Sequence, residues 1–144
     1  MPIESKFSIM CDEVRVENNG KFMIIGMYTP DMTVPQLPFV LPTLTFLLWL
    51  QTDRIGNVQF RASLDHLESG VGVAQAMGGF QIIGNQGIVL PIRLQGIRFM
   101  NQGPYTFSMS FDGQPPVTHP FNVILRIPNV PGMPGAPGIP GVHG

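Results

Sequence analysis

The first clear alternation of apolar and polar residues runs through residues 14–17, and an apolar run follows at residues 22–25. The sequence between them is Asn18-Asn19-Gly20-Lys21. An Asn-Gly pair between two strand-like runs is the strongest short-range signal for a β-hairpin, because both turn residues tolerate a positive φ. The pattern therefore predicts two paired strands near the N-terminus.

Two later stretches alternate strictly between apolar and polar positions, which is the period of a strand with one buried face. Residues 105–111 place every aromatic residue and methionine on one face, and residues 58–65 do the same with Val58, Phe60, Ala62 and Leu64. We expect residues 71–77 to be the antiparallel partner of residues 58–65, and residues 121–127 to form the last strand.

Residues 44–50 are apolar on both faces apart from Thr45. Such a run is typical of a central strand that is covered on each side, or of one that adds a second face to an interface. Trp49, the only tryptophan, lies in this run. We expect it to anchor the core.

Prolines and glycines divide the rest of the chain. Four prolines between Pro30 and Pro42 exclude a helix or a central strand and predict an extended crossing loop. Pro91 places the strand at residues 88–94 at a sheet edge or beside a bulge. Glycine pairs at 78–79 and within residues 84–87 leave room only for a short strand at residues 80–83.

These signals together predict an all-β fold. About eight short strands recur at a spacing of about ten residues, with turn residues between them, and no long stretch keeps a helical period. We expect residues 1–127 to form one antiparallel β-sandwich domain with Greek-key connections, of the immunoglobulin or C2-like kind.

Residues 128–144 have a different sequence period from the rest of the chain. Proline recurs at every third position from Pro128 to Pro140, and glycine at every third position from Gly132 to Gly144. This is the period of the polyproline-II helix, which has three residues per turn. The segment therefore has a glycine edge, a proline edge and an apolar third edge that consists of Val130, Met133, Ala136, Ile139 and Val142.

The apolar third edge favours contact with another protein over free solvation. One alternative is a collagen-like association of three chains, because four Gly-X-Y triplets begin at Gly132. A second is docking on a neighbouring subunit, as proline-rich ligands dock in aromatic-lined grooves. A third is a disordered, low-complexity terminus. The predicted contact residues are those of the apolar and proline edges: Val130, Met133, Ala136, Ile139, Val142, Pro131, Pro134, Pro137 and Pro140.

Composition narrows the range of partners. Charged residues make up only 12% of the chain, the formal net charge is −1, and the basic residues are scattered singly. A surface so poor in charge resists self-association weakly, and it gives no electrostatic reason to expect nucleic acid or an anionic membrane. The longest apolar run is too short to insert into a membrane. The N-terminus has no apolar signal segment, so we expect a cytoplasmic protein, with export by a signal-less route left open.

Candidate chemistry is sparse, and we expect neither an enzyme nor a bound metal or cofactor. No zinc-type spacing links His66, His119 and His143, although His66 and Glu68 would share one strand face. Cys11, the only cysteine, is expected to be a buried small residue. The carboxylates that would have to converge to bind calcium are Asp12, Glu13, Asp31, Asp53, Asp65, Glu68 and Asp112.

A sugar-binding face would need exposed aromatic rings beside amides. The residues that would supply such a face are Tyr28, Trp49, Tyr105, Gln51, Gln59 and Gln81. Because aromatic residues in strands usually belong to the core, we regard this as a minor alternative.

Several short segments resemble a family of short bacterial proteins whose function is uncharacterised. They are Cys11-Asp12-Glu13-Val14-Arg15, Gly20-Lys21, Ile25-Gly26-Met27-Tyr28, Asp31-Met32-Thr33-Val34-Pro35 and Leu41-Pro42. The resemblance covers roughly Cys11 to Leu125 and excludes the C-terminal segment. Since its motifs are turn glycines, loop prolines and apolar residues, it implies one compact β domain and transfers no catalytic residue.

The sequence therefore predicts a non-enzymatic structural protein. We expect a β-sandwich subunit of a homo-oligomer or filament, whose Pro/Gly tail docks on neighbouring subunits. The alternative is a monomeric β-sandwich that binds carbohydrate or calcium and carries a passive tail.

Overall fold

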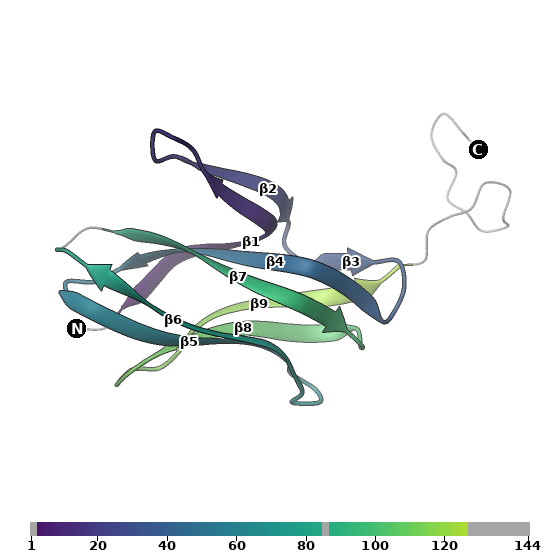
Figure 1. Ribbon diagram of the computed structural model, residues 1–144. Helices are drawn as coiled ribbons and strands as arrows, with labels where there is room; N and C mark the ends of the chain where they lie inside the picture. Colours follow the sequence, from purple (N-terminus) through teal and green to yellow (C-terminus); the bar gives the residue numbers. More distant parts are fainter. Residues whose placement is uncertain (1–2, 85–86, 127–144) are drawn as a thin grey trace, which may run out of the picture.

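A computed structural model describes residues 3–84 and 87–126. These residues form strands and contain no helix, which confirms the predicted all-β class (Figure 1). The strands are β1 (Glu4–Val16), β2 (Phe22–Tyr28), β3 (Met32–Val34), β4 (Phe39–Gln51), β5 (Gly56–His66), β6 (Gly72–Ile82), β7 (Ile88–Phe99), β8 (Gly103–Phe111) and β9 (Val117–Leu125). No helix in this described part is long or apolar enough to span a membrane.

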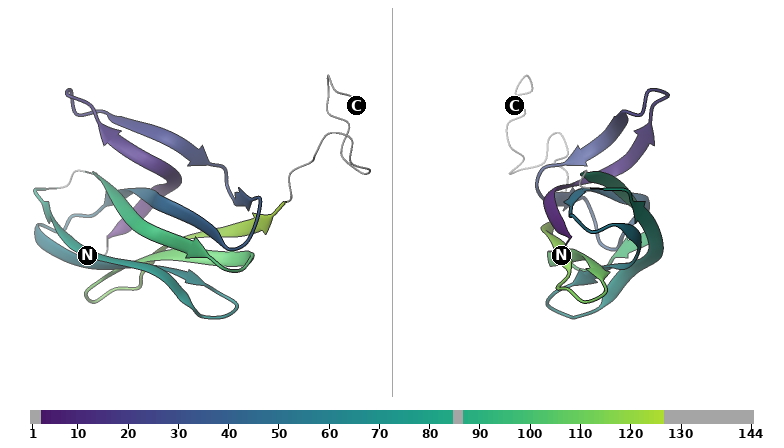
Figure 2. Two further views of the ribbon diagram at one scale, coloured as in Figure 1. Left: turned by 45° about the vertical axis from the view of Figure 1, so that its right-hand side comes forward. Right: turned by 90° about the vertical axis from the view of Figure 1, so that its left-hand side faces the viewer.

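The strands form two sheets that pack face to face, as a sandwich. Sheet A has the order β2-β1-β4-β7, and sheet B has the order β3-β9-β8-β5-β6. Figure 2 shows the two layers from the end of the molecule. The prediction of a wholly antiparallel sandwich is wrong at one place, because β3 pairs with β9 in parallel. Hydrophobic periodicity identifies a strand but carries no information on its direction, and β3 enters sheet B only after crossing from sheet A.

The core lies between the inward faces of the two sheets. Phe46 of β4 and Phe107 of β8 stack across it with ring centroids 4.1 Å apart, and Tyr105 stacks on Phe121 at 5.8 Å. Each fully buried side chain of this size contributes about 1.5–3 kcal/mol. Of the alternating residues of β5, Val58, Ala62 and Leu64 are buried as predicted, whereas Phe60 is only partly buried.

The predicted N-terminal hairpin is present as β1 and β2. Their antiparallel register runs from Met10↔Tyr28 to Val16↔Phe22. Gly20 in the turn has a φ of +86°, which the Asn-Gly signal anticipates. Figures 1 and 2 show that the end of this hairpin projects away from the sandwich.

The crossing loop is shorter than predicted. Strand β4 begins at Phe39 and includes Pro42, although prolines were expected to exclude this segment from a central strand. The pairing explains the difference, because β1 pairs with β4 only as far as Cys11↔Thr45. Pro42 therefore lies where β4 has no neighbour on the β1 side. Pro91 lies in β7, which is an edge strand, as predicted.

Gly78 and Gly79 do not form a turn. Strand β6 continues through both and ends at Ile82, so it includes all of the predicted separate strand at residues 80–83 except Ile83. A Cβ at Gly78 would lie 2.9 Å from the Phe60 ring, and one at Gly79 would lie 2.7 Å from the Gln59 amide. These glycines therefore make room for side chains of the neighbouring strand β5.

The predicted tail, residues 128–144, lies outside the described residues. So does Ile127, where the sandwich domain was predicted to end, and the last described strand ends at Leu125.

Candidate interaction surfaces

The outer face of sheet A carries a group of exposed apolar side chains. The pairings Phe7↔Trp49 and Cys11↔Met27 place these residues on one face, since paired residues share a side of the sheet. The same alternation continues to Ile25 and Met23. We call this group the outer face of sheet A: Phe7, Met23, Ile25, Met27 and Trp49, all of which are exposed.

Trp49 belongs to this outer face, so the expectation that it anchors the core is wrong. Its side chain is 41% exposed, and its ring meets Phe7 edge to face at a centroid distance of 5.3 Å. The run at residues 44–50 is apolar on both faces because its inward residues fill the core, while on its outward face Leu47 is buried and Trp49 is exposed. Trp49 is therefore exposed on the outward side of this strand, and an interface on that side stays a prediction.

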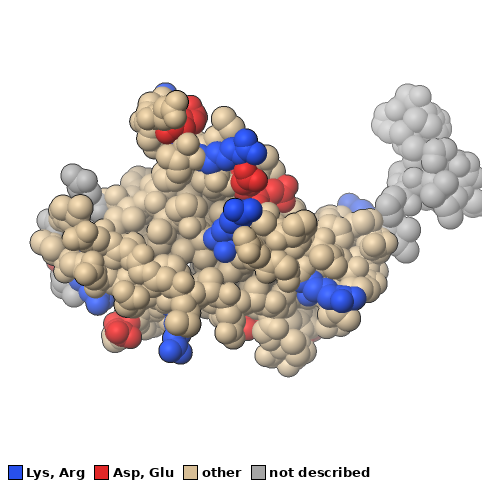
Figure 3. Space-filling model, viewed as in Figure 1, with Lys and Arg blue, Asp and Glu red and all other residues tan. Residues whose placement is uncertain are grey.

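Charged side chains lie beside these apolar residues, because Glu13 is paired with Ile25 and Arg15 with Met23. Figure 3 shows a largely uncharged surface, with positive and negative side chains close together where the hairpin meets the body and single charged side chains elsewhere. Arg15 forms an ion pair with Glu13, and Arg93 lies near enough for its charge to act on the Glu13 carboxyl. These two arginines hold the pKa of the Glu13 carboxyl below its ordinary value, mainly through the hydrogen bond from Arg15.

The end of the β1–β2 hairpin has apolar residues on its other face as well. Beyond Cys11↔Thr45, β1 pairs only with β2, and β2 has no extensive contact with any other described strand. We call residues 12–26 the projecting hairpin. The face that continues the core side of sheet A carries two cross-strand pairs, Val14↔Ile24 and Val16↔Phe22.

This inner face of the projecting hairpin is not covered by the second sheet. Val16 is 64% exposed and Ile24 is 38% exposed, while Val14 and Phe22 are half-buried by their neighbours on the ribbon. A two-stranded ribbon is marginally stable by itself, and apolar residues on such a ribbon normally pack on another layer. The described part of this chain does not supply that layer.

A polar junction separates the core from this apolar hairpin face. Asp12 lies opposite Gly26, whose φ is +68°, and a Cβ at position 26 would lie 2.8 Å from Cγ of Asp12. The Tyr28 hydroxyl donates a hydrogen bond to Asp12 Oδ1 at 2.6 Å. The backbone carbonyl of Asp12 accepts bonds from the hydroxyls of Thr43 and Thr45, both at 3.4 Å. The hairpin thus leaves sheet A at a fixed place.

An apolar groove lies beside this junction, between β1 and β9. It has a volume of about 400 Å³ and is lined by Ser8, Ile9, Met10, Met27, Tyr28, Thr29, Pro30, His119 and Pro120. Ser8 and His119 Nδ1 share a short hydrogen bond that connects the two sheets. The His119 ring also packs on Phe46 at 5.5 Å, and its burial lowers its pKa.

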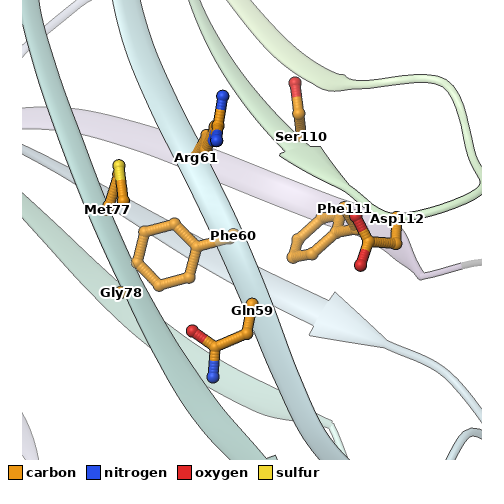
Figure 4. A pocket seen from close by; sticks show the side chains of 8 residues that line it. All are labelled: Gln59, Phe60, Arg61, Met77, Gly78, Ser110, Phe111 and Asp112. Carbon is orange, nitrogen blue, oxygen red and sulfur yellow. The ribbon is translucent and has the colours of Figure 1, made fainter.

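A second, more polar pocket lies on sheet B between β5, β6 and β8. Its volume is about 300 Å³, and Figure 4 shows its lining residues Gln59, Phe60, Arg61, Met77, Gly78, Ser110, Phe111 and Asp112. The lining combines the ring of Phe60 with amide, hydroxyl, guanidinium and carboxylate groups. This combination can hydrogen-bond a polar ligand and stack on its apolar side.

The two histidines that the structure describes, His66 and His119, do not lie together, and His143 is outside the described residues. His66 is buried, and its Nδ1 lies 2.7 Å from the Ser69 hydroxyl while Nε2 lies 3.2 Å from the Gln102 carbonyl oxygen. Glu68 is 3.8 Å from Nε2, so the expected His66–Glu68 proximity is present. The bond to Ser69 closes the turn after β5, and the bond to Gln102 connects this turn to the segment before β8. Strand β8 separates His66 on β5 from His119 on β9.

The candidate calcium ligands do not converge. Within residues 3–84 and 87–126, no group of three His, Cys, Asp or Glu side chains could hold a metal ion. Cys11 is fully buried as predicted, and burial raises the pKa of its thiol. The residues proposed for a sugar face are also dispersed, because Tyr105 is in the core, Tyr28 lines the groove and Trp49 is on the outer face of sheet A.

Sequence reasoning missed both the groove and the exposed hairpin faces. One signal was present, since residues 22–25 are apolar at four consecutive positions, whereas a strand with one wet face would alternate. The predicted contact residues of the tail, from Val130 to Val142, lie outside the described residues.

Comparison with known proteins adds a family but no activity. No curated protein matches this chain. Residues 6–124, which include the projecting hairpin, the groove and both sheets, match the model of DUF6941, described as a family of unknown function. The chain therefore belongs to this family of unknown function.

Proposed function

We propose that the protein is a non-enzymatic structural subunit that associates with copies of itself through the projecting hairpin. The observation that carries this proposal is the uncovered inner face of the hairpin, formed by Val14, Val16, Phe22 and Ile24. This face continues the core side of sheet A past the end of sheet B, so no strand of sheet B covers it. A second apolar layer of the same size would cover it.

The hairpin of a second copy is the partner that fits best. The inner face is apolar at both of its cross-strand pairs, so two copies related by a two-fold axis would present identical, complementary surfaces to each other. No charged side chain belongs to these pairs. Each ribbon would then cover an area of its own size, as the layers of a sandwich do.

The free edge of β2 supports association as well. The strand sequence FMIIGMY contains neither a charge nor a proline, and β2 is the outermost strand of sheet A. Natural edge strands are usually protected against pairing by lysine, proline or a covering loop. An unprotected apolar edge favours contact with another chain.

We propose that the Pro/Gly tail also contributes to self-association. Its three-residue period and its apolar edge from Val130 to Val142 favour docking on a neighbouring subunit in a homo-oligomer or filament. A collagen-like association of tails would require that the sandwich domains first bring three chains together.

We also propose that the sandwich is of the Greek-key, immunoglobulin or C2-like kind. The support is local, since the Tyr105 hydroxyl at the start of β8 donates a 2.6 Å bond to the carbonyl of Asn101, four residues upstream. A tyrosine in this position is a feature of immunoglobulin-like sandwiches.

Sedimentation of the full chain over a range of concentrations tests the proposal. The expected result is a mass above that of one 15.8 kDa chain, rising with concentration. A single 15.8 kDa species at every concentration would contradict it. Deleting residues 130–144 separates the two contributions, because an unchanged assembly state would remove the tail's proposed role while leaving that of the hairpin.

The pocket on sheet B supports a second candidate function, a monomeric ligand-binding sandwich. Phe60, Gln59 and Asp112 combine an aromatic ring with an amide and a carboxylate, which suits a carbohydrate (Figure 4). A thermal-shift screen against glycans and calcium tests it, because a ligand that binds only the folded state raises its stability by mass action. A shift that disappears in Gln59→Ala would favour this function.

A further inference from the structure

We propose that the apolar groove between β1 and β9 is the docking site for the Pro/Gly tail, residues 128–144, of a neighbouring copy of this chain. This inference rests on the proposed self-association and names the surface that receives the tail. The groove, the open strand edges beside it and the length of the tail support it independently of the hairpin.

The chemistry of the groove suits a polyproline-II segment. Its lining combines the ring of Tyr28, the imidazole of His119 and the pyrrolidine rings of Pro30 and Pro120 with the apolar side chains of Ile9, Met10 and Met27. Proline-rich segments bind to grooves built from flat rings, because a preformed extended helix loses little entropy on docking. The groove lining contains no Asp, Glu, Lys or Arg, and the tail contains none either.

Two open strand edges border the groove. On β1, pairing with β2 begins only at Met10, so the preceding residues of that strand have no neighbour on the groove side. On β9, pairing with β3 covers only Val123 to Leu125, so His119 and Pro120 are likewise at an edge. A polyproline-II helix makes no internal hydrogen bonds, so its backbone groups are available to such edges.

The position of β9 favours a neighbouring chain as the source of the tail. The groove contacts β9 at His119 and Pro120, near the start of the strand, and the chain leaves β9 at its far end, about 17 Å further along. A chain's own tail would have to reverse direction to reach its own groove. The tail of a second copy would reach about 50 Å in extended form and can enter without a reversal.

The apolar edge of the tail matches this site in spacing. Successive residues of that edge, such as Met133 and Ala136, are three positions apart and therefore about 9 Å apart along the axis. The groove can thus hold one or two of them against Tyr28 and Pro120, while the proline edge faces the neighbouring rings.

Cysteine cross-linking in the full chain tests this placement. The variant carries Pro120→Cys in the groove and Ala136→Cys in the tail, both in the presence of the fully buried Cys11. The matched control carries Gln75→Cys with Ala136→Cys, because Gln75 is exposed on β6, at the edge of sheet B opposite to the β9 side. After mild oxidation, peptide mass spectrometry identifies which cysteines are joined and whether they come from one chain or two.

The expected result is a disulfide between positions 120 and 136 of different chains, at least about five times more abundant than the 75–136 product. An excess of synthetic peptide with the sequence of residues 128–144 should reduce its yield. A 120–136 disulfide within one chain would overturn the proposal, since the chain's own tail would then be the occupant. A predominant 136–136 product would overturn it in favour of tail-to-tail association, and equal 120–136 and 75–136 yields would show that the groove has no preference.

These outcomes are distinguishable from failure of the proposed function. If the chain remains assembled by sedimentation but gives no preferential 120–136 product between chains, only the groove assignment fails. If the chain is monomeric at all concentrations, self-association itself fails.

Discussion

The Tyr28 hydroxyl donates a 2.6 Å hydrogen bond to the Asp12 carboxylate, and this contact spans the point where the projecting hairpin leaves sheet A. Burial raises the pKa of Tyr28, and the bond to Asp12 raises it further, so the phenol stays protonated and acts as a donor. Gly26 lies opposite Asp12 in the hairpin, with its Cα next to the Asp12 carboxylate. Asp12, Gly26 and Tyr28 therefore meet at the base of the hairpin, next to the bonds from Thr43 and Thr45 to the Asp12 carbonyl.

Replacement of Gly26 by alanine should destabilise the fold more than a comparable change elsewhere. The new Cβ would meet Cγ of Asp12 at 2.8 Å, and the backbone at φ +68° disfavours any side chain. The matched control is Gly113→Ala, because Gly113 has a φ of +79° with open space around it. We expect a loss of about 1 kcal/mol for Gly113→Ala, from backbone strain alone, and about 2–4 kcal/mol for Gly26→Ala.

Denaturant unfolding of the two variants measures this difference. Equal losses would mean that the Asp12 side chain moves aside at no cost, and that the Asp12–Tyr28 bond does not hold the junction.

Replacement of Tyr28 by phenylalanine should loosen the hairpin while the sandwich remains intact. The change removes the only donor hydroxyl on Asp12 Oδ1 in the described residues and costs about 1–2 kcal/mol. Hydrogen exchange should become faster for backbone amides of β2 and stay unchanged for those of β5 and β8. Uniformly faster exchange in all strands would show that the bond stabilises the whole fold instead of the junction.

Acidification should destabilise the protein through His119. Burial lowers the pKa of this imidazole below its ordinary value of 6.5, and Ser8, Phe46 and Phe121 around it carry no charge. The unfolded chain therefore binds more protons than the folded chain as the pH falls below 6.5, so stability decreases in that window. Above pH 6.5 the loss of stability through His119 is absent, because the imidazole is then mainly neutral in the folded and the unfolded chain.

Thermal unfolding between pH 7 and pH 5.5 measures this effect, with His119→Gln as the control. The native chain should lose more stability over this range than the variant, which has no imidazole at position 119. Identical pH dependence of the two proteins would show that His119 accepts its proton equally well in the folded and unfolded states.

The sequence predicted the β class and most strands, because alternation and turn residues are local properties. Val58, Ala62 and Leu64 were assigned to the core by their period alone. The turn at Gly20 was predicted from the Asn-Gly pair. The prediction of a turn at Gly78 and the exclusion of Pro42 from a central strand were wrong for the same reason. Whether a glycine turns the chain or makes room for Phe60, and whether a proline disrupts a ladder, depends on the neighbouring strand, which local sequence does not specify.

The surfaces were harder to predict than the strands. Trp49 looks like a core residue in sequence, and only the pairing Phe7↔Trp49 places it on the outside. The groove combines Ser8 with His119, which are 111 positions apart, and its existence depends on how the two sheets meet. The apolar run at residues 22–25 could have revealed the exposed hairpin, because it lacks the polar positions of a half-solvated strand.

The most direct measurement of the central claim is the mass in solution of Ile24→Lys beside that of Met77→Lys. Ile24 belongs to the hairpin's inner face and is 38% exposed, whereas Met77 is 74% exposed on β6 of sheet B. Both changes add one positive charge at an exposed apolar position, and neither should unfold the chain. We predict that Ile24→Lys sediments as a single chain at concentrations where the native protein and Met77→Lys are assembled. An assembly that survives Ile24→Lys unchanged, in a variant that remains folded, would contradict association through the hairpin.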